Sequence, residues 1–238
     1  MIRSVTGNKS SQERGFETKL SSEEHGGFAD KYIGDSIVAV FGAPLDEPDH
    51  ATNAVRAALQ CSARLGTLDR VSREFGGTLR QRIGINSGRA LVGNIGSQRR
   101  FNYTVLGDMV NLASRLEGSN KHYGTTIIVS ETTVALTGAA FAWRELDTIR
   151  VKGRTQAVRI YQPLGLAGQV ASDVLSRAHT YEEGLKRYRA RDFAGAAEKF
   201  AIVAGGDPPS ALFLARVRHF AQQSPGSEWE PVNVQEAS

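Results

Sequence analysis

The sequence has one cysteine, Cys61, among 238 residues, so it cannot form an internal disulfide, and such usage is compatible with a reducing compartment. It lacks any run approaching the roughly 18 apolar residues of a membrane span, and its first residues lack the apolar centre of a secretion signal. No cluster of basic residues is interleaved with aromatic ones, as nucleic-acid binding would favour. We therefore predict a cytoplasmic protein with no membrane segment in this chain and no nucleic-acid partner.

A further absence concerns the start of the chain. Residues 1–23 are polar without a periodic apolar pattern, and no aspartate occurs before Asp30. We interpret residues 1–23 as a degenerate polar segment, and the stretch that leads to the first clear hairpin is too short for two helices.

The composition is that of an ordinary globular protein, with 40% hydrophobic and 23% charged residues. The length suits one domain with an appendage, or two small domains. The net charge of +4 suits a polyanionic ligand, although a charge of this size more often reflects only a mildly basic surface.

Two stretches carry the candidate chemistry. In KYIGDSIVAVFG (Lys31–Gly42), apolar runs flank a Gly-Asp pair, which predicts a tight β-hairpin with Asp35 at its tip. In FNYTVLGDMVNLASRLE (Phe101–Glu117), a strand and a turn precede a helix that places Asn111 and Arg115 four residues apart on one face. A carboxylate on one element with an amide and a guanidinium on another suits a metal-bound polyphosphate.

The rest of the chain up to about residue 166 alternates strands and helices, which predicts an α+β fold with a mixed sheet and helices packed on one side. The expected helices are at about 49–75, 108–121 and 131–136, and the expected further strands at 79–86, 90–95, 101–106, 125–129, 143–151 and 157–161.

From Ser172 the pattern is helical only, and we predict a helical tail over 172–223 and a flexible C-terminus over 224–238, with Trp229 as a candidate anchor. A tetratricopeptide-like unit and a plain helical hairpin fit the tail equally well, and a single unit must dock on the body or on a partner to bury its apolar face. The residues with tetratricopeptide-like spacing are Gly184, Phe193, Ala196, Phe200 and Pro208.

The two stretches, with INSGRALVGNIGS (85–97) and VKG (151–153), resemble the class III adenylate and guanylate cyclases. The resemblance covers about residues 24–164 and implies a partial cyclase domain over 24–166 with the family's ferredoxin-like fold, here lacking the first strand and two helices. It implies ATP as the substrate, attack of its 3′-hydroxyl on the α-phosphate, and Mg²⁺ or Mn²⁺ as the cofactor.

The resemblance also implies roles for single residues. Asp35 matches the family's second metal-binding aspartate. Asn111 and Arg115 match the pair that orients the ribose and stabilises the transition state, and Lys152 matches the lysine that binds the triphosphate. Outside this motif context, Asp35 would be a turn residue, the Asn/Arg pair a solvated helix face, and Lys152 a solvated lysine.

Lys31 and Thr104 resemble the ATP-selecting pair of one bacterial subgroup. A lysine donor can meet adenine N1, and a threonine oxygen can accept from the exocyclic amine. Guanylate cyclases have a glutamate-type acceptor where Lys31 stands.

In the family, the metal-binding aspartates and the base- and ribose-binding residues come from different subunits, so the resemblance implies a homodimer or a heterodimer with another cyclase domain. Relatives begin with a strand that bears the first metal-binding aspartate, and the matching position here is Gln12. We therefore expect little activity from a homodimer. A non-catalytic cyclase-like module that pairs with an intact cyclase remains open as an alternative. A diguanylate cyclase is disfavoured by the GDSIV turn and the VNLASR helix.

Overall fold

The computed structural model describes residues 2–6, 11–34, 36–74, 81–97, 100–151 and 153–235. The chain forms two compact units, one of Met1–Lys121 with Thr126–Ala140 and one of His122–Thr125 with Phe141–Ser238. Within the described part of the chain, every helix is too short or too polar to serve as a membrane span.

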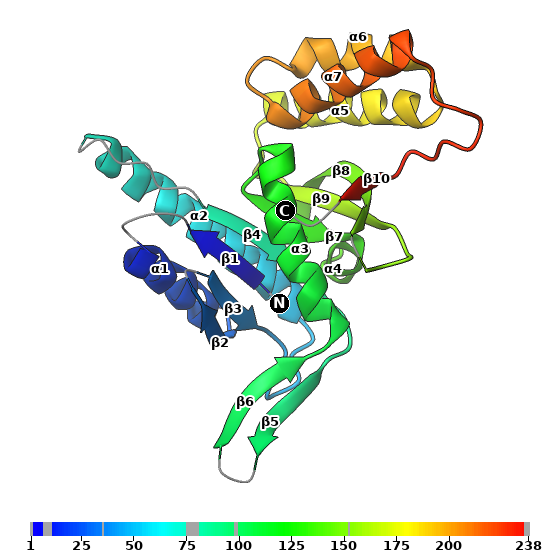
Figure 1. Cartoon of the computed structure of the whole chain (residues 1–238). Helices are drawn as coiled ribbons and strands as arrows, with labels where there is room; N and C mark the ends of the chain where they lie inside the picture. Colours follow the sequence, from blue (N-terminus) through cyan, green and yellow to red (C-terminus); the bar gives the residue numbers. More distant parts are fainter. Residues whose placement is uncertain are drawn as a thin grey trace. The chain divides into compact units, whose positions relative to one another are not determined.

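The first unit contains a mixed sheet in the strand order β7-β4-β1-β3-β2 and a separate two-stranded ribbon of β5 and β6 (Figure 1). In the sheet, β4 and β7 are parallel and the other neighbours are antiparallel. The elements of this unit are β1 (Ile2–Thr6), α1 (Ser11–Glu24), β2 (Phe28–Ile33), β3 (Ser36–Val40), α2 (His50–Glu74), β4 (Gln81–Ile85), β5 (Leu91–Ser97), β6 (Arg100–Leu106), α3 (Asp108–Tyr123, whose last two residues belong to the second unit), β7 (Ile127–Ser130) and α4 (Glu131–Leu136).

The α+β fold is confirmed, but the prediction that helices cover one side of the sheet is wrong. On β4, Gln81 hydrogen-bonds to Cys61 of α2, whereas the neighbouring Arg82 donates to Glu117 of α3 at 2.8 Å. Successive side chains of a strand point to opposite faces, so α2 and α3 cover opposite faces of the sheet. Figure 1 shows α3 in front of the strands and α2 behind them.

The structure also differs from the sequence prediction at the start of the chain. Ile2–Thr6 forms strand β1 between β3 and β4, and Ser11–Glu24 forms helix α1. The segment predicted to be degenerate therefore supplies a strand and one helix, rather than none, before the first hairpin. Pairing on both sides of β1 supplies backbone partners that an isolated polar stretch of sequence does not reveal.

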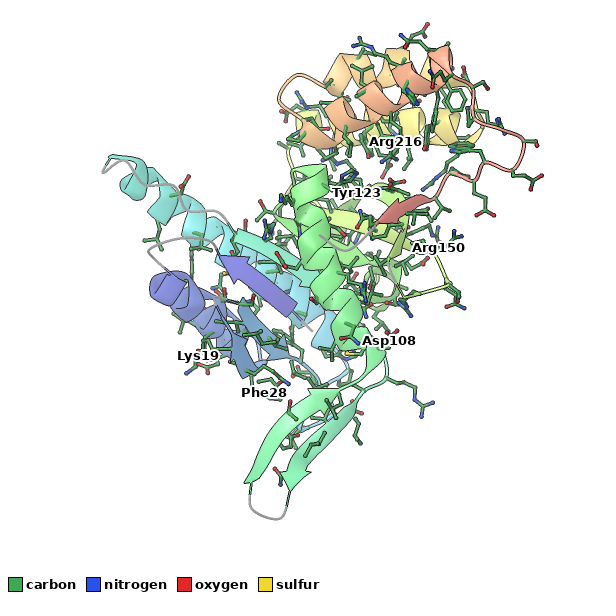
Figure 2. All side chains as sticks on the ribbon, in the orientation of Figure 1. Lys19, Phe28, Asp108, Tyr123, Arg150 and Arg216 are labelled. Carbon is green, nitrogen blue, oxygen red and sulfur yellow. The ribbon has the colours of Figure 1, made fainter. Side chains whose placement is uncertain are left out.

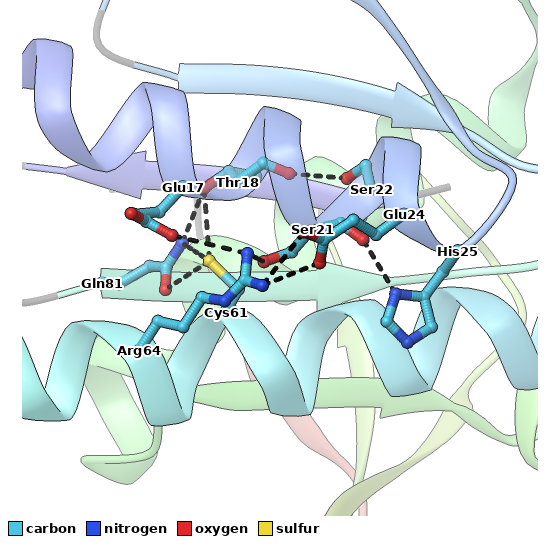
Figure 3. A network of polar contacts seen from close by, with 9 residues as sticks. All are labelled: Glu17, Thr18, Ser21, Ser22, Glu24, His25, Cys61, Arg64 and Gln81. Atoms are coloured by element: carbon cyan, nitrogen blue, oxygen red, sulfur yellow. Dashed lines mark hydrogen bonds and ion pairs between the residues drawn. The ribbon is translucent and has the colours of Figure 1, made fainter.

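Helix α1 is held on α2 by a polar network (Figure 3). Arg64 of α2 donates to the Glu24 carboxylate at 2.8 Å. Gln81 of β4 donates to the Thr18 hydroxyl at 2.9 Å and to the Cys61 sulfur at 3.2 Å. These contacts explain why α1 lacks the apolar periodicity of a core helix, because much of its contact with α2 and β4 is polar.

The second unit combines an antiparallel pair, β8 (Phe141–Val151) and β9 (Val158–Leu166), with three helices. The predicted helical hairpin is thus a three-helix arrangement, and the tetratricopeptide comparison remains a prediction. Gly184 suits this packing because a Cβ atom there would lie 3.0 Å from the ring of Phe200. The helices are α5 (Ser172–Arg189), α6 (Phe193–Val203) and α7 (Pro208–Gln222).

Helices α5 and α7 of the second unit dock on β8. The Tyr181 hydroxyl of α5 donates to the Leu146 carbonyl at 2.6 Å. Asp147, almost fully buried, accepts from the Tyr123 hydroxyl at 2.7 Å and from Arg216 of α7 at 3.0 Å, and the last two are labelled in Figure 2. Burial and the Asp147 charge raise the pKa of Tyr123 well above its ordinary value, so this phenol remains a donor. The second compact unit therefore joins β8 and β9 to the helices that the sequence assigned to a tail from Ser172.

The closing segment, predicted to be flexible, is partly structured. β10 (Asn233–Gln235) pairs in parallel with β8. The indole of Trp229 lies edge-on to the rings of Tyr188, Phe193 and Phe220, with centroid distances of 5.3, 5.7 and 5.5 Å. Trp229 therefore anchors this segment on α5, α6 and α7, as the sequence suggested.

We predict that Trp229→Ala lowers the unfolding free energy of the second unit by about 2 kcal/mol, less than for a fully buried tryptophan because the indole is half-buried. Chemical denaturation of the full chain measures this. Ile202→Ala is the control, since Ile202 is 70% exposed on α6 and its truncation should change stability by less than about 0.5 kcal/mol. Equal effects of the two substitutions would contradict the anchoring role.

Candidate functional site

Lys31 on β2 and Thr104 on β6 meet in the structure. The Lys31 ammonium donates to the Thr104 hydroxyl oxygen at 2.6 Å. The Lys31 side chain is 37% exposed, so one end of this pair is open to solvent. The two residues that the sequence singled out for base selection are thus in direct contact within one chain.

A third residue, Asp30, joins this pair, and sequence reasoning missed it. The Thr104 hydroxyl donates to Asp30 Oδ2 at 3.2 Å, and Lys31 Nζ lies 3.1 Å from the same oxygen. Neighbours on a regular strand point to opposite faces, but β2 shifts register against β3 between Ala29 and Lys31. This β-bulge lets the adjacent Asp30 and Lys31 side chains reach the same hydroxyl. The signal in the sequence was only that an acidic residue precedes Lys31.

Asn111 and Arg115 lie one helical turn apart on α3, as predicted. Asn111 is exposed and Arg115 is half-buried, whereas the apolar residues expected to seat the helix face inward. Of those, Leu112, Ala113 and Leu116 are buried. The amide and the guanidinium are therefore available to a ligand rather than part of the core.

The first turns of α3 pack beside the strand that carries Thr104. Val105, the next residue of β6, lies in a buried cluster with Ala113, and Met109 and Val110 pack against it. Val38 and Val40 of β3 complete the cluster. One small core thus supports both the strand of Thr104 and the helix of Asn111.

Three successive residues of β4 fix where α3 lies. Arg82 pairs with Glu117, and the Ile83 carbonyl accepts from the buried Asn120 amide at 2.9 Å. At Gly84 the backbones nearly touch, because a Cβ atom there would lie 2.2 Å from the Ala113 carbonyl oxygen. Only glycine permits α3 to lie this close to the strand.

The remaining predicted residues, Asp35 and Lys152, lie outside the described residues. The hairpin around Asp35 has the predicted form, since Ile33 pairs with Ser36 and Gly34 has a φ of 61°. Within the described ranges, no three side chains of His, Cys, Asp or Glu lie close enough together to hold a metal ion.

The site lies in a domain of a known class. The family model for the adenylate and guanylate cyclase catalytic domain matches residues 20–163. The chain belongs to this family. The match begins within α1 and leaves β1 outside.

Curated relatives are similar over much of the chain. Adenylate cyclase 1 of Rhizobium meliloti is 40% identical over 147 residues, which cover 61% of this chain and 22% of that protein. The terminal-differentiation-specific adenylate cyclase of Dictyostelium discoideum is 31% identical over 203 residues, which cover 82% of this chain and 10% of that protein. Any alignment that covers 82% of this chain must include α5, so the similarity to the Dictyostelium protein continues into the helical tail. The chain spans only about a tenth to a fifth of these relatives' lengths.

Solved structures agree with this assignment. The adenylyl cyclase CyaB from P. aeruginosa superposes with a TM-score of 0.63 at 28% identity, covering 71% of this chain and 95% of that one. The guanylate cyclase domain of RhGC from Catenaria anguillulae, in complex with GTP, has a TM-score of 0.57 at 27% identity, covering 69% of this chain and 94% of that one.

We predict that Gly84→Ala displaces α3 or unfolds the first unit, since a methyl group would overlap the Ala113 carbonyl and lie 2.3 Å from the Glu117 nitrogen. The unfolding free energy should fall by at least about 3 kcal/mol. Gly118→Ala on α3 is the matched control, because a Cβ atom there meets nothing within 4 Å and should stabilise the helix by roughly 0.5–1 kcal/mol. Thermal denaturation of both variants tests this, and tolerance of Gly84→Ala would contradict the close approach.

Proposed function

We propose that the chain is an adenylate cyclase-type domain that converts ATP to cyclic AMP and pyrophosphate in cyclic-nucleotide signalling. The observation that carries this proposal is the 2.6 Å contact between Lys31 and Thr104. Family membership and the likeness to named adenylate cyclases support it.

The Lys31–Thr104 pair fits adenine. The ammonium can donate to adenine N1, and the hydroxyl oxygen can accept from the exocyclic amine. Guanine presents a donor at N1 and an acceptor at O6, so the same pair would meet it with the wrong polarity. A buried polar group left unpaired in this way costs about 1–3 kcal/mol, enough to select one base.

Asn111 and Arg115 fit the sugar and the reacting phosphate. In the proposed reaction, the 3′-oxygen bonds to the α-phosphorus while the bond from that phosphorus to the pyrophosphate oxygen breaks. The Asn111 amide would orient the ribose, and the planar Arg115 guanidinium would neutralise charge that builds on the phosphate oxygens. Lys152 would hold the triphosphate.

A second subunit completes the proposed site. The β2–β3 hairpin and the β5–β6 ribbon expose large apolar side chains, and a surface of this kind favours burial against another domain. The exposed side chains are Tyr32, Ile33, Leu91, Tyr103 and Leu106. The partner is another cyclase domain, either a second copy or an intact relative.

The need for metal-binding carboxylates favours an intact relative over a second copy of this chain as the partner. Mg²⁺ or Mn²⁺, when bound, would lower the pKa of the 3′-hydroxyl and neutralise phosphate charge. Asp35 is the one metal-ligand candidate with motif support. Gln12, which the resemblance matched to the first metal-binding aspartate, bears no carboxylate, and it lies in helix α1 rather than in a strand. We propose that the chain supplies the base- and ribose-binding half of the site to a partner with intact metal carboxylates.

The test uses a class III adenylate cyclase in which the residues matching Lys31, Thr104, Asn111 and Arg115 are replaced by alanine. Mixed with this chain, Mn²⁺ and ATP, it should form cyclic AMP, because each protein supplies the half that the other lacks. The chain alone should be at least about 100-fold slower, since it lacks one metal carboxylate. A mixture that forms no cyclic AMP would overturn the half-site proposal. If this chain alone forms cyclic AMP as fast as the mixture does, the need for a partner is refuted.

Within the same mixture, Arg115→Ala in this chain should lower the rate of cyclic AMP formation by about 10²–10³-fold, the usual cost of removing one transition-state donor. Arg56→Ala is the control, because Arg56 is exposed on α2, which covers the opposite face of the sheet from α3. Similar losses in both variants would exclude a catalytic role for Arg115.

A non-catalytic module is the second candidate, and the glutamine at position 12, where the resemblance expects a metal-binding aspartate, favours it. Such a module would bind a cyclase partner and change its activity without lending residues to the reaction. In the mixture, this candidate predicts that Arg115→Ala has no effect on any activity that the chain restores.

A further inference from the structure

We propose that Asp30 sets the base specificity of this site by turning Thr104 into an acceptor, so that adenine is bound and guanine is rejected. Asp30 would act as a positioning residue that need not touch the nucleotide. This inference rests on the proposed function and adds a residue to it.

The proposal depends on which hydrogen bonds the Thr104 hydroxyl can still form with a ligand. A hydroxyl has one proton to donate and two lone pairs to accept with. A carboxylate can only accept, so the 3.2 Å contact with Asp30 Oδ2 consumes the Thr104 proton. Lys31 donates to the same oxygen at 2.6 Å and occupies one lone pair. What remains for a ligand is one lone pair, which can accept from the exocyclic amine of adenine but cannot donate to guanine O6.

Asp30 also restrains the other member of the pair. Its Oδ2 lies 3.1 Å from Lys31 Nζ, so the ammonium is held between a carboxylate and a hydroxyl. The ammonium has three protons, and these two contacts leave one to donate to a base nitrogen. The bulge in β2 makes the arrangement possible, because it brings both neighbouring side chains to Thr104.

The burial of Asp30 points to a role beyond stabilising the fold. Its side chain is 1% exposed, and its second oxygen, Oδ1, is buried without a hydrogen-bond partner among the described residues. A carboxylate retained only for folding would be expected to have both oxygens paired, since an unpaired buried oxygen is unfavourable. The polarity that Oδ2 imposes on Thr104 gives a reason for the carboxylate at this position.

The experiment measures the ratio of cyclic AMP to cyclic GMP formed from an equimolar mixture of ATP and GTP, with the chain paired to the base-site-deficient partner. This ratio reports relative kcat/KM and does not depend on how much of the chain is folded. Asp30→Leu has a similar shape but no acceptor, so Thr104 becomes free to donate. We expect the ratio to fall at least tenfold, equivalent to about 1.4 kcal/mol.

Two further variants distinguish a change in the hydrogen-bond direction of Thr104 from a general structural effect of replacing Asp30. Asp30→Asn keeps an oxygen that can accept from both Thr104 and Lys31, so the ratio should stay within about threefold of that of the unaltered chain. In a Thr104→Val background, which has no hydroxyl to orient, Asp30→Leu should change the ratio less than twofold. Asp46→Leu, at an exposed loop position, is the control for introducing leucine.

Each outcome decides a different point. A ratio unchanged by Asp30→Leu while cyclic AMP is still formed overturns the role of Asp30 and leaves the proposed function standing. An equal fall in the Thr104→Val background also overturns it, because Asp30 would then act by another route. Absence of any cyclic nucleotide from the unaltered chain in the mixture overturns the proposed function and this inference together.

Discussion

The close approach of α3 to β4 at Gly84 is the constraint on which the candidate site depends. Helix and strand are in near-contact there, and the Asn120 amide and the Arg82–Glu117 pair join them on either side. A helix held at its backbone cannot rotate or slide without breaking these contacts together. The direction in which Asn111 points is therefore decided by residues that never meet a ligand.

A second constraint acts on the strand side of the site. The bulge in β2 breaks the alternation of side chains, and this break brings Asp30 beside Lys31 on the same hydroxyl. The two constraints meet in the small apolar cluster around Val105, which packs against the first turns of α3. Helix α3 thus presents an amide and a guanidinium, and β6 presents the Thr104 hydroxyl in contact with Asp30 of the bulged β2, all supported by one core.

Part of this could be predicted from sequence. The four-residue spacing of Asn111 and Arg115 follows from helical periodicity alone, and the structure keeps both outside the core. The Lys31–Thr104 pair came from resemblance. Asp30 could not be found, because a bulge depends on register with a partner strand and leaves no periodic signal. The strand and helix within residues 1–24 were missed for a related reason, since their partners lie far along the chain and many of their contacts are polar.

The single thiol of the chain is enclosed where α1, α2 and β4 meet, between Thr18 and Gln81. Burial raises the pKa of Cys61, so near neutral pH the reactive thiolate is scarce and shielded. Alkylating reagents can therefore reach it only when this layer separates. The chain carries a built-in reporter of local opening, and the alkylation rate of Cys61 would reveal how often α1 detaches without any label having been introduced.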